Sequence, residues 1–207
     1  MRFSEKEIVF LTSVSRGRLP FGVTYEIPPV SERKNYVEET IRSLKKKAIL
    51  DEAGQLTREG AEILHLWEQY RNSKRHIRLN HLNVAILAKG MLFIVIQMED
   101  SYELGCIHSA LVMTELLKNA EYLCRDEQVP IRGKWEKIEN GTWSEDKEVV
   151  DGCILLYEYD TGILMQEKVY YWKGQSGYLY HKTRQRIREL SPAVMRKQIY
   201  RILEGSE

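Results

Sequence analysis

A β-hairpin predicted over residues 82–98 constrains the fold of this chain most. The runs "LNVAILA" and "MLFIVIQM" are rich in β-branched and apolar residues, and Lys89-Gly90 forms a two-residue loop between them. After the turn "EDS", "YELGCIH" predicts a third, weaker strand. Ser109 is then expected to cap a helix that runs to about Leu123. The segment therefore predicts three strands followed by one helix.

The same order of elements returns near the C-terminus. "CILLYEY" predicts a strand, Asp160-Thr161-Gly162 a turn, "ILMQEKVYYW" a long strand and "YLYHK" the start of a third. Ser191-Pro192 predicts the start of a helix, because proline lacks the N–H group that would be unpaired there. Gly205 is a suitable end for that helix. The pattern is repeated, although the residues are not.

Helices are predicted ahead of the first strands. Ser4 and Glu7 form an S-x-x-E capping box, and Ser31 and Thr57 are expected to cap the second and third helices. Apolar residues in the second helix recur at intervals of four, three and four, namely Val37, Ile41, Leu44 and Ala48. The polar stretch "RNSKRHIRLNH" is expected to be a basic connection to the first strand.

These elements predict an α+β fold. We expect an antiparallel sheet built from two degenerate strand-strand-strand-helix halves, with an N-terminal helical cluster. The expected division is an N-terminal half over residues 1–124, a connector over 125–151 and a C-terminal half over 152–207, together forming one compact domain. The length of 207 residues suits one such domain. The connector is expected to hold at most one short strand, at "GKWEKI".

Charge and hydropathy exclude several classes of protein. Lys and Arg number 31 against 30 acidic residues, so the net charge of +1 favours neither nucleic acid nor anionic lipid. The longest apolar run, 91–96, is far shorter than the roughly 20 residues that cross a bilayer. No signal peptide is visible at the N-terminus. We therefore expect a cytoplasmic protein without membrane insertion.

Motifs for catalysis or metal binding are missing from the sequence. The three cysteines are widely spaced, so neither a disulfide framework nor a zinc site is indicated. No H-E-x-x-H, G-x-S-x-G, Walker A or G-x-G-x-x-G motif occurs. We expect no enzyme activity, no catalytic residue, no cofactor and no metal.

A nucleic-acid interpretation is the first alternative. Residues 44–67, "LKKKAILDEAGQLTREGAEILHLW", are similar to the tail of a winged helix, and a basic cluster follows at Arg71, Lys74, Arg75 and Arg78. However, "DEAGQ" is too short and too acidic to form a wing. We therefore read the segment as a structural helix pair, and a DNA-binding regulator stays the alternative.

The aromatic residues indicate protein binding more directly than the basic cluster indicates nucleic-acid binding. Seven of them crowd the second predicted meander, and because strand residues alternate between faces, one face cannot bury them all. Those on an uncovered face would be suitable anchors for a partner. Helices on both faces would explain the same residues without a partner. The predicted binding residues are Tyr157, Tyr159, Tyr171, Trp172, Tyr178 and, in the last helix, Ile199.

The order of elements resembles the EspG-like chaperones of type VII (ESX) secretion. The resemblance runs through "FSEKEIVFLTSV", "RLPFGVTYEIP", "LKKKAILDEAGQLTREGAEIL", "VAILAKGMLFIVIQ", "SYELGCIHS" and "ALVMTELLKNAEYL", and the chain would be a compact variant. It implies a cytosolic, non-enzymatic chaperone that keeps a helical secretion substrate soluble and releases it for export. A toxin-neutralising immunity protein is a further alternative, and the resemblance leaves a homo-oligomer open.

Overall fold

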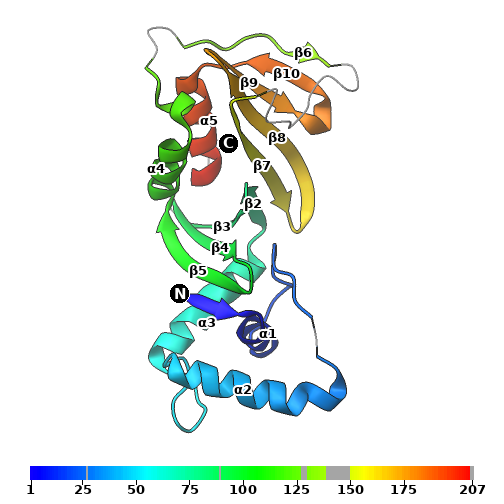
Figure 1. The fold of residues 1–207 in the computed structure, drawn as a ribbon, viewed down its shortest axis with the longest axis vertical. Helices are drawn as coiled ribbons and strands as arrows, with labels where there is room; N and C mark the ends of the chain where they lie inside the picture. Colours follow the sequence, from blue (N-terminus) through cyan, green and yellow to red (C-terminus); the bar gives the residue numbers. More distant parts are fainter. Residues whose placement is uncertain (27, 89, 127–129, 139–149, 206–207) are drawn as a thin grey trace. The chain divides into compact units, whose positions relative to one another are not determined.

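The computed structural model describes residues 1–26, 28–88, 90–126, 130–138 and 150–205. It confirms the α+β class, and every strand pair whose register is described is antiparallel (Figure 1). The chain divides into two compact units that interleave in sequence. The first comprises Met1–Ser73 and Phe93–Gly105, and the second comprises Lys74–Leu92 and Cys106–Glu207.

The first unit holds all three predicted N-terminal helices. Its elements are β1 (Arg2–Ser4), α1 (Glu5–Val14), the 3-10 helix η1 (Val30–Glu32), α2 (Arg33–Lys46), α3 (Arg58–Asn72) and parts of β4 (Met91–Gln97) and β5 (Ser101–His108). β1, which the sequence did not predict, pairs with β5 and places Phe3 opposite Tyr102.

Two of the three caps predicted for the N-terminal helices are confirmed. Ser4 Oγ accepts from the Glu7 N–H at 3.3 Å, and Glu7 Oε2 accepts from the Ser4 N–H at 2.7 Å, which completes the capping box. Thr57 Oγ1 accepts from the Gly60 N–H at 3.0 Å. The prediction for Ser31 is wrong, because this residue lies inside η1 and α2 begins only at Arg33.

The apolar stripe predicted for α2 is only partly buried. Leu44 is fully buried, but Val37 is 42% exposed and Ala48 lies beyond the end of the helix, with a φ of 55°. The other buried side chain of α2 is Thr40. The spacing therefore identifies the helix but overestimates how much of it is covered.

Aromatic rings form the core of the first unit. Trp67 and Tyr70 of α3 stack with their centroids 5.5 Å apart, and Phe93 of β4 lies 5.3 Å from the Tyr70 ring. All three side chains are buried. The Tyr70 hydroxyl donates to the carbonyl of Phe21 at 2.6 Å, which ties the loop after α1 to this core.

The second unit is dominated by strands, in the order β3-β2-β7-β8-β9-β10-β6. Its elements are β2 (Arg75–Leu79), β3 (Leu82–Ala88), α4 (Ser109–Asn119), η2 (Glu121–Cys124), β6 (Glu136–Lys137), β7 (Gly152–Asp160), β8 (Ile163–Lys173), β9 (Ser176–His181), η3 (Lys182–Arg184), β10 (Arg186–Glu189) and α5 (Pro192–Glu204). The strands expected at "CILLYEY", "ILMQEKVYYW" and "YLYHK" are thus present, and β10 is an additional one.

Two local predictions in this unit need correction. The stretch expected to be a basic connection contains β2, which pairs with β3 and β7 and buries Ile77 and Leu79 completely or nearly so. The helix expected from Ser109 to Leu123 ends at Asn119 and is followed by η2. Its cap is His108, whose Nδ1 accepts from the Ala110 N–H at 3.2 Å.

Helices cover one face of the β7–β9 meander. α4 and α5 pack side by side (Figure 1). The Tyr170 hydroxyl of β8 contacts Gln198 of α5 at 3.5 Å. By strand alternation, Tyr170 shares its face with Ile154, Leu156 and Leu179, all of which are buried. We call this side of the meander the helix-covered face.

The start and end predicted for α5 are both confirmed. Pro192 occupies the first helical position after Ser191, and Gly205 follows the last turn with a φ of 74°, a conformation that favours glycine. The apolar stripe of this helix is buried, namely Met195, Ile199, Ile202 and Leu203. No helix in the part of the chain that the structure describes is long and apolar enough to cross a membrane.

Candidate protein-binding surface

Four of the six predicted binding residues lie on the other side of the β7–β9 meander. Tyr157 and Tyr159 alternate along β7, whereas Tyr171 of β8 pairs directly with Tyr178 of β9. Because paired strand residues point to the same side, these four tyrosines and Tyr180 share one face. We call this surface the tyrosine face. It is opposite the helix-covered face.

The tyrosines pack against one another and stay partly accessible. Each of the five is half-buried, and the rings of Tyr171 and Tyr178 stack with centroids 5.2 Å apart and planes 23° from parallel. Val169, whose strand neighbours include Tyr180, is almost fully buried on this face. Burial, and secondarily the neighbouring Tyr178, raises the pKa of Tyr171 to about 12. The Tyr171 hydroxyl is therefore neutral at physiological pH.

The β7–β8 hairpin extends this surface with exposed apolar side chains. Ile163 is 65% exposed, Leu164 46% and Met165 54%. Thr161 and Gly162 both have positive φ, at 49° and 85°, as expected for the tight turn predicted at Asp160-Thr161-Gly162. We call residues 163–165 the hairpin tip. An exposed apolar cluster next to partly exposed aromatic rings is typical of a surface that binds another protein.

A β-bulge places Leu164 of the hairpin tip on the tyrosine face. Glu158 pairs with Gln166, but Tyr159 pairs with Leu164, so Met165 is the extra residue in β8. Without this shift, strict alternation would place Leu164 on the helix-covered face with Gln166 and Lys168. Sequence reasoning missed the tip, although three consecutive apolar residues directly after a predicted turn were a visible signal.

Trp172 and Ile199 do not lie on the tyrosine face. Trp172 is 8% exposed on the helix-covered face, where its ring stacks on Tyr122 of η2, and Ile199 is fully buried in α5. The strand neighbours of Trp172 are Gly152 and Gly177. A Cβ at Gly152 would clash with the Trp172 ring, and one at Gly177 would clash with Tyr122. These two glycines make the space that buries the tryptophan.

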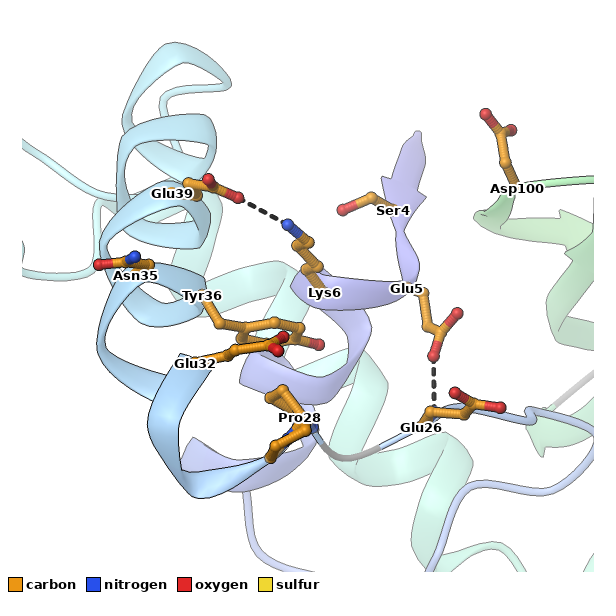
Figure 2. Close-up of a pocket in the computed structure, with 11 residues that line it drawn as sticks. Ser4, Glu5, Lys6, Glu26, Pro28, Glu32, Asn35, Tyr36, Glu39 and Asp100 are labelled. Carbon is orange, nitrogen blue, oxygen red and sulfur yellow. Dashed lines mark hydrogen bonds and ion pairs between the residues drawn. The ribbon is translucent and has the colours of Figure 1, made fainter.

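The first unit also contains a cavity of about 600 Å³ (Figure 2). Lys6 binds Glu39 across it at 2.6 Å and lowers the pKa of that carboxyl, while Glu5 accepts from the Glu26 N–H at 2.6 Å. Glu32 and Asp100 add further negative charge to the lining. Among the described residues, no group of three or more His, Cys, Asp or Glu side chains is arranged to hold a metal ion. An acidic lining of this kind repels phosphate.

The predicted basic cluster is only partly available to nucleic acid. The Arg71 guanidinium is buried and donates to the carbonyls of Thr12, Ser15, Gly17 and Arg18 at 2.6 to 3.2 Å. Arg75 forms an ion pair with Glu158 at 3.0 Å. Only Lys74 and Arg78 of the four are exposed. Two of the four cations on which the DNA-binding alternative depends are thus engaged within the protein.

The fold and this surface define an α+β protein with an aromatic face and an exposed apolar hairpin tip. The chain belongs to the family described as "Domain of unknown function (DUF5081)", whose model matches residues 1–131, more than half of the chain. No curated protein matches the chain. The tyrosine face and the hairpin tip lie beyond the residues that the family model matches.

Proposed function

We propose that this chain is a non-enzymatic cytosolic chaperone that binds a helical type VII secretion substrate, keeps it soluble and delivers it for export. The observation that carries the proposal is the continuity of the tyrosine face with the hairpin tip. Tyr159 and Leu164 are paired across β7 and β8, so aromatic and apolar side chains meet on one surface. A partner that covered this surface would bury the most exposed apolar segment of the meander.

A helical partner suits this surface chemically. An amphipathic helix buries an apolar stripe about one side chain wide, and a row of tyrosines offers a matching band of rigid contact area. Tyrosine loses little conformational freedom on binding and keeps a hydroxyl for polar contacts at the rim. A few aromatic anchors with a polar surround give a complex that is specific but releasable. Release is what delivery to a secretion machine requires.

The assignment to type VII secretion rests on the resemblance in element order over residues 3–123. The described structure has the elements that carry this resemblance, including α1, the helix pair α2 and α3, the strands β3 to β5, and α4. The tyrosine face supplies the contact chemistry, and the resemblance supplies the kind of substrate. The two parts of the proposal can therefore be tested separately.

The binding part is tested by purifying the tagged chain from its native cells and identifying its partner. We expect one secreted, mainly helical protein in stoichiometric amount. Leu164→Asp places a charge at the hairpin tip and should remove this partner. Leu111→Asp is the matched control, because Leu111 is 55% exposed on α4 of the same unit but lies outside the surface. Equal retention of the partner by both variants would exclude the hairpin tip as its contact.

The delivery part is tested by export. Cells that lack the chain should accumulate the partner in the cytosol and secrete none, and the wild-type gene should restore secretion. A partner that is exported normally without the chain, but becomes toxic to the cell, would favour the immunity-protein alternative instead. Recovery of nucleic acid alone, lost in high salt, would favour the regulator.

A further inference from the structure

A cavity of about 410 Å³ in the second unit has a strongly cationic lining. It opens on the helix-covered face of the meander, beside the C-terminal part of α5 and strand β10. Six lining side chains are cationic and one is a carboxylate: Arg75, Arg132, Lys168, Arg184, Arg188, Arg201 and Glu158. Such an imbalance within one cavity contrasts with the net charge of +1 of the whole chain.

The single carboxylate is already neutralised by two of these cations. Glu158 is buried, and its Oε1 accepts from Lys168 Nζ at 2.6 Å while its Oε2 accepts from Arg75 Nη2 at 3.0 Å. The other four lining cations are arginines. Among the described residues, these four form no ion pair. The lining therefore keeps a large uncompensated positive charge.

Two buried polar groups in the cavity lack a partner within the described part of the chain. They are Nε of Arg188 and Nδ1 of His181, and the His181 side chain is only 4% exposed. Trp135 holds both residues in place, since the Arg188 guanidinium lies 4.3 Å from its ring centroid and the His181 ring packs against it edge-on. Buried polar atoms without partners are costly and mark positions where a ligand gains hydrogen bonds.

Burial and neighbouring cations lower the pKa of both groups, while Tyr170 opposes this effect at Arg188 and Glu158 opposes it at His181. Burial and the nearby Arg132 lower the pKa of Arg188. Burial, and then Arg184 and Lys168, lower the pKa of His181. An anion in the cavity would relieve this mutual repulsion and would supply the acceptors that the buried donors lack.

We propose that this cavity is a binding site for a small molecule that carries a phosphoryl or pyrophosphoryl group. Arginine binds such oxyanions through paired N–H groups, and several arginines around one cavity match several negative charges better than a single carboxylate would. A volume of about 410 Å³ falls in the size range of small-molecule pockets. The proposal is independent of the tyrosine face, which lies on the opposite side of the meander.

Isothermal titration of the full chain with inorganic pyrophosphate, at constant ionic strength, tests the site. Arg188→Gln should weaken binding by at least about tenfold, because it removes a bidentate contact. Arg78→Gln is the matched control: it makes the same charge change in the same unit, but on an exposed strand residue that does not line the cavity. This variant should change the affinity less than about twofold.

Each remaining outcome decides the proposal. If Arg188→Gln fails to fold, the exposed pair Arg132→Gln with Arg184→Gln replaces it, and the same loss of affinity is expected. Equal weakening by Arg78→Gln would show only general charge attraction and overturn the site. Absence of pyrophosphate binding would overturn it too. Tighter binding of an acidic peptide than of pyrophosphate, at equal charge, would replace the small-molecule ligand by a polypeptide.

Discussion

The ring of Tyr122 lies flat against the ring of Trp172, with centroids 5.7 Å apart and planes 7° from parallel. The Tyr122 hydroxyl also donates to the Leu190 carbonyl at 3.2 Å, so η2 is tied both to β8 and to the segment that leads into α5. Trp172 is thus part of the structural core of the second unit. Its neighbour Tyr171, one residue earlier, faces the opposite way.

This stacking predicts a loss of stability when Trp172 is replaced. Trp172→Ala should lower the free energy of unfolding by about 3–5 kcal/mol, because it leaves a cavity between two glycines and Tyr122. Urea unfolding followed by circular dichroism measures the change. Tyr178→Ala, on the tyrosine face, is the comparison and should cost less, since Tyr178 is only half-buried. A smaller effect at Trp172 than at Tyr178 would contradict the assignment of Trp172 to the core.

The contacts of Arg71 predict that its replacement destabilises the first unit. Its guanidinium binds four backbone carbonyls after and near the end of α1, and lysine cannot make these contacts with one ammonium group. Arg71→Lys should therefore destabilise the protein by roughly 3 kcal/mol. Arg58→Lys is the control, because Arg58 is almost fully exposed and forms a surface ion pair with Glu62. We expect it to change stability by less than about 0.5 kcal/mol.

Tyr171 predicts a dependence of stability on alkaline pH. The pKa of this phenol is about 12 in the folded chain and about 10 when unfolded. Below pH 10 both states are protonated, so its contribution is fully present. Between pH 10 and 12 only the unfolded state loses the proton, so stability falls as pH rises. Tyr171→Phe should make this fall shallower. Urea unfolding at pH 8, 10 and 11 measures the slope, and parallel curves would refute the prediction.

The hairpin tip predicts self-association of the purified chain. Three consecutive exposed apolar residues favour contact with any apolar surface, including a second copy. The sedimentation coefficient should therefore rise across a concentration series. Ile163→Ser with Met165→Ser should remove this rise while leaving the melting temperature nearly unchanged, because exposed residues contribute little to stability. A rise that persists in the double variant would locate the contact elsewhere.

Local signals predicted several helix ends, although Ser31 and Ser109 are not the caps of α2 and α4 and α4 ends before Leu123. The capping box of Ser4 and Glu7, the Thr57 cap and the Pro192 start of α5 each depend on groups a few residues apart, so the sequence contains all the information. β2 was missed for the opposite reason. Its charged residues resemble a loop, and only pairing with β3 and β7 makes it a strand.

The sequence predicts which tyrosines belong to the candidate surface, but it does not predict which side of the sheet the helices cover. The density of aromatic residues in the second meander led to the choice of Tyr157, Tyr159, Tyr171 and Tyr178, and all four lie on the tyrosine face. Alternation shows that Tyr171 and Trp172 point to opposite sides, but it does not say which side the helices cover. That choice depends on Gly152 and Gly177, whose relation to Trp172 appears only once the strand register is known. The bulge at Met165 is equally nonlocal.

The exposed hairpin tip has a consequence for how such a protein is supplied. Ile163, Leu164 and Met165 stay exposed unless another molecule covers them, so each copy made without the proposed partner adds exposed apolar surface to the cell. Excess production would lead to aggregation or to degradation by quality control. Balanced synthesis of the two proteins, as from neighbouring genes read together, would keep the surface occupied. We therefore expect the chain to be hardest to keep in solution when it is expressed at high level without the proposed partner.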